Sequence, residues 1–325
     1  MPPVSPLPAR HGLGAAHLCT PSRTRGVADA WPTMGAWLRH RLPEHVDVAG
    51  MLADGSFVDE DGRALRDDDP YVPARHVWFH RIVRDEPVVP GTIHVVHRDE
   101  RLVVVDKPPF LSTIPRGRHI VQSVVVRLRD ELDLPELSPL HRLDRGTSGI
   151  LLLATERRWR GAYQTAFERR TMDKTYRALA PVRADLELPT VVRNHLRKVR
   201  GTLHAEVVPD APVNAETLVE LEREVDGLGV YRLTPRTGRT HQLRLHLSDL
   251  GIPIVGDPLY PVLRDVDLDD FREPMQLLAA GIAFTDPVDG RRREFRSVRS
   301  LPLTSAMPPA ARVPAAVGER SAATT

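Results

Sequence analysis

The chain has 325 residues, of which 41% are hydrophobic and 27% charged, and its 45 Lys and Arg against 43 Asp and Glu residues leave a formal net charge of +2. A chain of this length can bury about 70–75% of its unfolded surface, as one large domain or as a core with a smaller appendage. The single cysteine, Cys19, excludes an internal disulfide framework and a four-cysteine zinc site, and no apolar run approaches the roughly 18 residues of a membrane helix.

The N-terminal sequence MPPVSPLPARHG lacks the basic and apolar regions of a secretory leader. Together with the cysteine content, this favours a protein of the reducing cytoplasm. We expect a monomer that has no membrane contact and no obligate protein partner.

Both ends of the chain are rich in Pro, Ala, Gly and Arg and lack apolar periodicity. Residues 1–33 and 303–325 are therefore expected to be disordered. Residues 34–88 predict a small N-terminal module, with a short helix over 35–41 and a strand over 76–83.

After a proline-bearing linker, residues 89–302 are expected to form one larger domain. Its strand patterns cover 92–97, 101–106, 150–154, 175–182, 202–209, 216–225 and 228–235. Its helical patterns cover 121–133, 157–170 and 240–250. Strands dominate and helices punctuate them, so the predicted class is α+β, with a mixed or antiparallel sheet and flanking helices.

Basic residues gather in stretches that contain no acid. Residues 190–205 and 231–248 contain arginine, lysine or histidine but neither Asp nor Glu, and 157–170 adds five arginines beside one glutamate. The acids are concentrated elsewhere, chiefly in 59–69 and 265–270. Such runs can be solvated faces, but their number favours a polyanionic partner, for which nucleic acid is the obvious candidate.

The densest polar cluster is HRLDRGTSG at 141–149, directly before an apolar strand. Its one carboxylate, Asp144, stands between Arg142 and Arg145, and positive charge favours the ionised form that acts as nucleophile or base. A serine nucleophile would need the pattern G-x-S-x-G, which the residues around Ser148 do not match. A surface turn with a local salt bridge is the alternative interpretation.

Five segments, in one order, resemble the RluA-type family of RNA pseudouridine synthases. HRLDRGTSGILLLA resembles the family signature, KTYRA at 174–178 its K-x-Y-x-A strand, and TGRTHQLRLHL at 237–247 its T-G-R-T-H-Q segment. VVVDKPPFLS at 103–112 and PIVGDPLY at 253–260 resemble the family's opening strand and its P-I-x-G-D segment. The resemblance spans about residues 92–302 and implies the α+β synthase core, with RNA as partner and conversion of uridine to pseudouridine as activity.

The resemblance also implies roles for individual residues. Asp144 matches the catalytic aspartate, Tyr176 the ring that packs on the target uracil and handles a proton, and Arg244 the ion-pair partner that orients the aspartate. Arg142 matches an arginine that helps to displace the target nucleotide from its stack, although a simple phosphate contact is its alternative role. Further substrate contacts are implied for Lys174, Arg239, His241 and Gln242.

Family members often carry an N-terminal RNA-binding module, and residues 34–88 resemble a degenerate form of it. Their acidic character weakens any role in binding RNA, because residues 59–69 contain six Asp and Glu residues and only two arginines.

Pseudouridine formation involves no net redox change and no hydrolysis, so we expect neither a cofactor nor a metal. The sequence contains no phosphate-binding loop, dinucleotide fingerprint or H-E-x-x-H pattern. The carboxylate could attack the anomeric carbon or remove the 2′ proton, and the target base must first leave its stack. Loops of transfer RNA and of large-subunit ribosomal RNA are both plausible substrates by family analogy.

Two other functions stay open from the sequence. One is a non-catalytic RNA-binding protein or assembly factor that retains the fold. The other is a glycosidase or nucleoside hydrolase, which would need a second carboxylate beside Asp144; Asp257 is the candidate.

Overall fold

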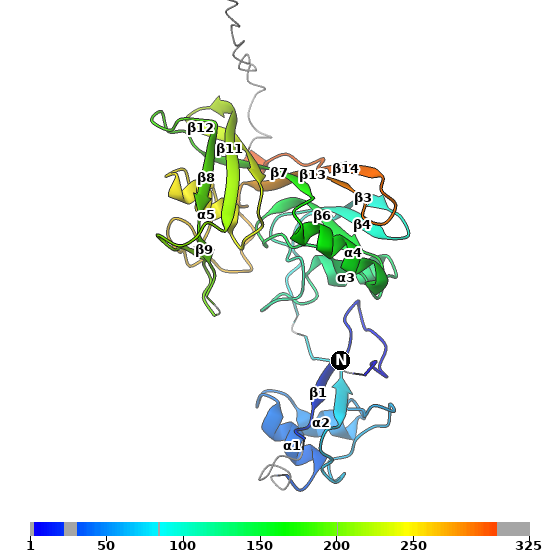
Figure 1. The fold of residues 1–325 in the computed structure, drawn as a ribbon. Coiled ribbons are helices and arrows are strands. Elements are labelled where there is room, and N and C mark those ends of the chain that lie inside the picture. The colour runs from blue at the N-terminus through cyan, green and yellow to red at the C-terminus, as the bar shows by residue number, and fades with distance from the viewer. Residues whose placement is uncertain (1–2, 23–30, 84, 200, 304–325) are drawn as a thin grey trace, which may run out of the picture. The chain divides into compact units, whose positions relative to one another are not determined.

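The chain divides into two units, a smaller one of residues 1–86, 117–121 and 126–135 and a larger one of the remainder (Figure 1). The computed structural model describes residues 3–22, 31–83, 85–199 and 201–303. Residues 117–121 and 126–135 belong to the smaller unit although they follow residue 88. The predicted boundary at residue 88 therefore separates only the first 86 residues of that unit from the larger one.

The smaller unit contains two short helices and a two-stranded antiparallel sheet. Helix α1 is Met34–Arg41 and helix α2 is Val48–Ala53, while β1, Ala16–Cys19, pairs with β2, His76–Phe79. The predicted helix is thereby confirmed, and the predicted strand over 76–83 is confirmed only in its first half.

Polar caps and an apolar core explain these elements. The side chains of Thr33 and Asp47 each accept a hydrogen bond from a backbone N–H in the first turn of the helix that follows, which fixes where the helix begins. Trp37, Leu38 and Phe57 are buried in the core of the unit.

The prediction that residues 1–33 are disordered is wrong for β1. Ala16 and Leu18 of that strand pack on the core of the smaller unit, whereas His17 and Cys19 between and beyond them are exposed. Four residues are too few for this alternation to stand out in the sequence. The predicted C-terminal tail lies, except for Leu303, outside the described residues.

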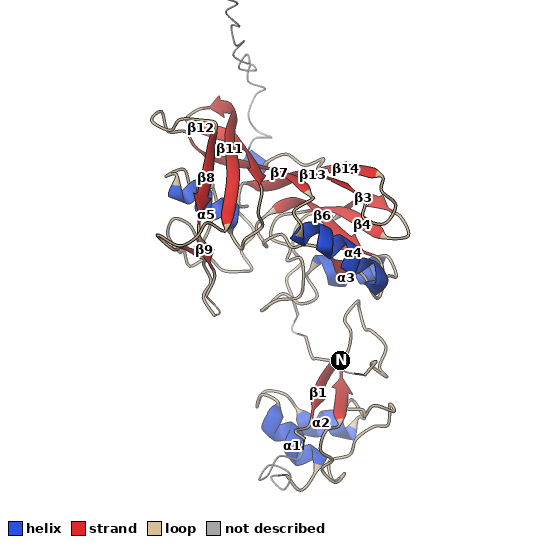
Figure 2. Cartoon of the chain, in the orientation of Figure 1, coloured by secondary structure: helices blue, strands red, loops and turns tan. Residues whose placement is uncertain are grey.

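The larger unit is built on a ten-stranded sheet in the order β3-β4-β6-β13-β7-β12-β11-β8, with β14 paired to β13 and β5 to β6. The strands are β3 His94–Arg98, β4 Leu102–Lys107, β5 Ser138–Pro139, β6 Ser148–Ala154, β7 Asp173–Pro181, β8 Thr190–Asn194, β11 Ala215–Val225, β12 Leu228–Pro235, β13 Leu277–Thr285 and β14 Arg292–Arg296. β13 and β6 pair in parallel and the other neighbours pair in antiparallel fashion. The predicted α+β class and mixed sheet are confirmed (Figure 2).

Three helices occur in the stretches that the sequence predicts, each a few residues shorter than expected. They are α3, Val124–Glu131, α4, Arg157–Glu168, and α5, Gln242–Asp249. Helix α4 buries Tyr163 and Ala166 in the core cluster that includes the apolar residues of β6. Helix α5 buries Leu243 and Leu247 beside the apolar residues of β7 and β12.

The sequence patterns missed β8, β13 and β14. In β13 the buried residues do not alternate with exposed ones, so a period of two is absent from its sequence LLAAGIAFT. The predicted strand over 202–209 shrinks to β10, Glu206–Val207, which pairs only with β9, Leu196–Arg197.

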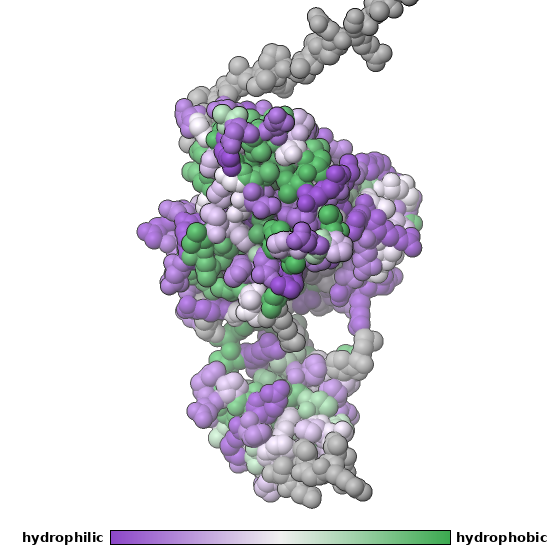
Figure 3. All heavy atoms as spheres, turned by 60° about the vertical axis from the view of Figure 1, so that its left-hand side comes forward, coloured by the Kyte–Doolittle hydropathy of each residue, from purple (hydrophilic) through white to green (hydrophobic). Residues whose placement is uncertain are grey.

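Figure 3 shows hydrophilic and hydrophobic residues intermixed over the visible face of the larger unit. Exposed apolar side chains of the larger unit include Val262 and Leu263. Across the part of the chain that the structure describes, every helix is too short or too polar to cross a bilayer.

Candidate active site

The turn that carries Asp144 is held in place on the residue before it. The backbone N–H of Leu143 donates to the Thr113 hydroxyl at 3.1 Å, and the Leu143 carbonyl accepts from the same hydroxyl at 2.8 Å. The N–H of Thr147 donates to the Asp144 carbonyl at 3.1 Å and closes the turn. Thr113 is buried, so water does not compete for these bonds.

Lys107, the last residue of β4, holds the same turn on the other side. Its ammonium group is fully buried and donates to the carbonyls of Pro108 at 2.9 Å, Leu111 at 2.7 Å and Arg145 at 3.2 Å. Burial lowers the pKa of Lys107 to about 7, and the negative charge of Asp144 opposes that shift. Because three acceptors require three N–H donors, the protonated form fits this position.

Asp144 is the exposed member of a series of three charged side chains, Asp144, Arg244 and Asp257. Its Oδ2 accepts from Nη1 of Arg244, on α5, at 3.2 Å, and its side chain is 36% exposed. Arg244 is 5% exposed and turns its other edge to Asp257, whose two oxygens accept at 2.7 and 2.6 Å. The predicted pair of Asp144 and Arg244 is thus brought together, and Asp257 fixes the guanidinium in a two-bonded arrangement.

His241 also lies next to the Asp144 carboxylate. It stands at the start of α5 with φ 58°, and its Nε2 lies 3.8 Å from Oδ2 of Asp144. Its Nδ1 is 2.9 Å from the hydroxyl of Tyr260, which also bonds both backbone groups of Ala205. Burial lowers the pKa of His241 to about 4, so the ring is neutral at neutral pH.

Tyr176 and Lys174 lie on β7, at the centre of the sheet. Tyr176 is half-buried, and burial together with the charge of Asp144 raises the pKa of its phenol to about 12. The group therefore stays protonated at neutral pH and can donate a hydrogen bond, but it is a poor base. Lys174 donates to the Thr237 carbonyl at 3.1 Å, and burial, with the neighbouring Arg170, lowers the pKa of its ammonium group.

Gln242 supports the site without facing it. Its Oε1 accepts from the Thr237 hydroxyl and the Arg239 N–H, and its Nε2 donates to the Glu216 carbonyl and the Thr217 hydroxyl. The side chain is buried with its amide fully bonded inside the protein, and its substrate contact stays a prediction. The side chain of Arg239 is exposed, with Nε 3.3 Å from the Asn214 carbonyl.

The two arginines that flank Asp144 in sequence have different environments. Arg142 is exposed and forms no ion pair or hydrogen bond within the described part of the chain. Arg145 makes no ion pair with Asp144 either, because its guanidinium lies over the rings of Phe110 and Phe271. The ion-pair partner of Asp144 is therefore Arg244, not one of its two neighbours as the sequence pattern suggested.

Gly149 explains the glycine of the signature. It is the second residue of the buried strand β6 and has φ 107°, and a Cβ atom there would lie 2.3 Å from the carbonyl oxygen of Ala279 on β13. Only glycine allows β6 and β13 to approach this closely, directly after the turn that carries Asp144.

Sequence reasoning missed the supporting residues Lys107, Thr113 and the role of Asp257. A lysine that ends an otherwise apolar strand was a usable signal for Lys107, since an unpaired charge is not buried without compensation. Within the described residues, no group of three His, Cys, Asp or Glu side chains is placed to hold a metal ion.

Comparison with known proteins agrees with this geometry. A family model described as RNA pseudouridylate synthase matches residues 101–249, which include Asp144, Tyr176 and Arg244. The dual-specificity RNA pseudouridine synthase RluA of Vibrio vulnificus is 33% identical over 212 residues, which cover 62% of this chain and 80% of that protein. The ribosomal large subunit pseudouridine synthase D of Pseudomonas aeruginosa is 27% identical over 295 residues, 79% of this chain and 85% of that protein.

The fold gives the same result. The solved structure of human RNA pseudouridylate synthase domain containing 1 superposes with a TM-score of 0.53 at 25% identity, covering 66% of this chain and 86% of that one. The matching family model and relatives are RNA pseudouridine synthases, and the solved structure shares the fold of this chain. This chain belongs to that class, in its RluA-type family, and is an enzyme that acts on RNA.

Proposed function

We propose that the protein isomerises specific uridines of structured RNA to pseudouridine by a reaction that depends on Asp144 and needs no cofactor. The observation that carries the proposal is the state of this carboxylate. Oδ2 is bonded to a buried arginine, and Oδ1 has no hydrogen-bond partner within the described residues while the side chain is 36% exposed. A carboxylate that is oriented by one oxygen and open at the other is suited to act on a sugar.

The chemistry conserves every atom of the nucleoside except for exchange of protons with water. The bond between C1′ and N1 breaks, the base turns, and a bond forms between C1′ and C5. The proton of C5 leaves to water and N1 regains one. Asp144 assists the sugar step either by attack at C1′ or by removal of the 2′ proton.

Arg244 orients Asp144, and Asp257 limits the neutralising effect of that arginine. Because the guanidinium is shared between two carboxylates, the group of three carries a net negative charge and Asp144 keeps its anionic character. Asp257 is fully buried with both oxygens bonded, so it cannot serve as the acid that a glycosidase or nucleoside hydrolase needs.

Tyr176 supplies a ring beside Asp144 for stacking on the target uracil, and its protonated hydroxyl can donate to the turning base. A stacked uridine cannot reach Asp144, so the base is flipped out at a cost of about a few kcal/mol, least in a loop. Arg142, exposed two residues from Asp144, is placed to fill the space that the base leaves or to hold a phosphate.

The RNA substrates we propose are ribosomal RNA, transfer RNA or both. The support is the names of the relatives, one a dual-specificity enzyme and the other an enzyme of the large ribosomal subunit. The exposed Arg142 and Arg239 and the partly exposed Lys174, called the cationic rim below, offer positive charge to RNA phosphates. The cytoplasmic location and the monomeric state remain predictions from the sequence.

The test is release of tritium to water from RNA that carries uridine labelled at C5, with the purified chain and its Asp144→Asn variant. Bulk unmodified RNA is offered first, followed by ribosomal and transfer RNA separately. We expect release by the wild type and none above background by the variant, with equal thermal stability. No release by the wild type, with RNA binding intact, would favour the alternative of a non-catalytic RNA-binding protein.

A further inference from the structure

Arg145 follows Asp144 directly, and its side chain contacts two aromatic rings and a backbone carbonyl of the protein. Its guanidinium carbon lies 5.4 Å from the ring centroid of Phe110 and 5.7 Å from that of Phe271, and Nη2 donates to the carbonyl of Leu268. Burial lowers the pKa of Arg145 and the charge of Asp269 opposes the shift. Arg145 is thus surrounded by protein groups, unlike the exposed Arg142.

Phe110 adopts a backbone conformation that a bulky residue rarely takes. Its φ is 66°, in the left-handed region that favours glycine, and its ring is buried. Such a conformation costs free energy and persists only where surrounding contacts hold it, as functional sites often do. The contacts here are Arg145 and the ring of Phe271, whose centroid lies 5.6 Å from that of Phe110 at an interplanar angle of 66°.

The clamp, defined here as Phe110, Arg145 and Phe271, joins two segments that are far apart in sequence. Phe271 and Leu268 belong to the loop of residues 261–273, and Leu268 lies 123 residues beyond Arg145. The carbonyl of Arg145 is the one that accepts from buried Lys107, so backbone and side chain of this residue are fixed independently.

The loop of residues 261–273 differs from the cationic rim in its exposed apolar side chains and in its charge. Val262 and Leu263 are 70% and 53% exposed, and the side chains of Asp265 and Asp267 are exposed without an ion pair to any described residue. The loop also carries Arg264 and Arg272, which are ion-paired to Glu273 and Asp270, so acids outnumber arginines and its net charge is negative. A negative net charge disfavours phosphates. RNA contacts through an arginine beside this loop would have to overcome that repulsion.

We propose that Arg145 is a positioning residue that attaches the loop of residues 261–273 to the catalytic turn. This attachment fixes the position of the Asp144 carboxylate, and Arg145 itself does not contact RNA. The inference rests on the assignment of Asp144 in the proposed function. It predicts that Arg145 acts through Phe271 on the rate of the reaction and has little effect on affinity for RNA.

The alternative role for Arg145 is a contact with a phosphate. The two roles predict different effects of the substitution Arg145→Lys. A lysine would keep the charge that a phosphate needs but would lose the flat guanidinium that lies over two rings and reaches a carbonyl. Five variants separate the two roles. Three are the single substitutions Arg145→Lys, Arg145→Met and Phe271→Leu, and the fourth is the double variant Arg145→Met with Phe271→Leu. The fifth, Arg296→Met on the exposed end of β14, is the control.

The experiment measures single-turnover tritium release with saturating enzyme and, separately, the Kd for RNA at several salt concentrations. We expect Arg145→Lys and Arg145→Met to slow release by about 10- to 100-fold, as small misplacements of reacting groups do. Kd is expected to stay within about twofold, with an unchanged salt slope. Phe271→Leu is expected to slow release as well, and the double variant to be no slower than Arg145→Met, because both break one clamp.

Three results would overturn the inference: full activity of Arg145→Lys, a salt slope reduced by about one in Arg145→Met, or additive losses in the double variant. Thermal unfolding of each variant shows whether slow release reflects unfolded protein. If the wild type itself releases no tritium, the proposed function has failed, and a change of Kd or salt slope in Arg145→Met still decides whether this arginine contacts RNA.

Discussion

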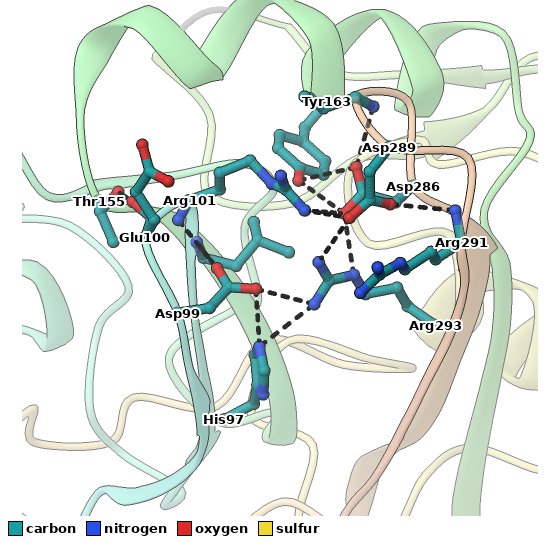
Figure 4. A network of polar contacts seen from close by, with 12 residues as sticks. His97, Asp99, Glu100, Arg101, Thr155, Tyr163, Asp286, Asp289, Arg291 and Arg293 are labelled. Carbon is teal, nitrogen blue, oxygen red and sulfur yellow. Dashed lines mark hydrogen bonds and ion pairs between the residues drawn. The ribbon is translucent and has the colours of Figure 1, made fainter.

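Two arginine–carboxylate networks in the larger unit are built from the same groups. The first is the series Asp144, Arg244 and Asp257. The second, the edge network of Figure 4, joins the β3–β4 turn, the β13–β14 turn and α4 through Asp99, Arg101, Tyr163, Asp286, Asp289 and Arg293. In it, Arg293 contacts Asp99 at 2.8 Å and Asp286 at 2.9 Å, and the Tyr163 hydroxyl donates to Asp286 at 2.9 Å.

The two networks differ in what they leave unbonded. Asp286 is fully buried and has both oxygens bonded, so the edge network offers no group to a ligand there. Asp144 is one-third exposed and keeps one oxygen without a partner in the described part of the chain. The same kinds of group thus form a structural network where both carboxylate oxygens are bonded, as in Asp286. Where one oxygen is unbonded, as in Asp144, that oxygen is available to a substrate.

The sharpest test of this comparison removes one buried carboxylate from each network. Asp257→Asn leaves Arg244 poorly anchored, and we expect single-turnover release to fall about 100-fold. Asp286→Asn should lower the free energy of unfolding by about 3 kcal/mol, since it leaves buried cations without their partner, but should leave the rate of the folded enzyme unchanged. Denaturant unfolding and tritium release on both variants check this. Equal losses of activity would remove the distinction between the networks.

Lys107→Met tests whether the pinned turn matters for the rate. Methionine fills a similar volume but donates to none of the three carbonyls, so Arg145 loses one of its restraints. We expect release to slow about tenfold or more, with Kd for RNA unchanged. A variant that releases tritium at the wild-type rate would show that Thr113 alone suffices.

The histidines of the larger unit predict the response of stability to acid. Burial lowers the pKa of His141 to about 3 and the pKa values of His241 and His246 to about 4, below their ordinary value. The unfolded chain therefore binds these protons first, at about pH 6.5, and stability is lost as the pH falls from there towards 4. Urea unfolding at pH 7, 6 and 5 measures the slope, which His246→Gln should flatten; a stability that rises on acidification contradicts the assignment.

Arg142→Ala should have the smallest effect. If this exposed arginine meets a phosphate, its loss reduces the salt slope of RNA binding by about one and weakens binding uniformly across sequences. Filter binding at four salt concentrations measures this, and Arg145→Met, which we expect to keep the full slope, is the matched comparison.

The sequence predicted those parts of the fold that repeat a local pattern. The hairpin over 92–106 and the helices α4 and α5 carry such patterns, and all three are present. β13 was missed because it is buried without alternation, and β1 because it is short and its partner lies about 60 residues away. Local propensity carries no information on such distant pairing.

For the site, motif resemblance identified Asp144 and Arg244, which lie 100 residues apart in sequence and 3.2 Å apart in the structure. It did not distinguish Gln242, whose amide is consumed internally, from residues that face the rim. Nor could it show that Arg145 turns away from Asp144, because the direction of a side chain depends on Phe110 and Phe271.

The two restraints on either side of Asp144 have a consequence for how such an enzyme can change. With Leu143 held by Thr113 and Arg145 by Lys107, the conformational entropy of the turn is lost when the protein folds, before RNA arrives. Adaptation on binding then falls to the RNA and to the exposed rim. With the roles proposed above, we expect substitutions on the rim to change which RNA is bound without altering the reaction at Asp144, so target choice and catalysis can evolve separately.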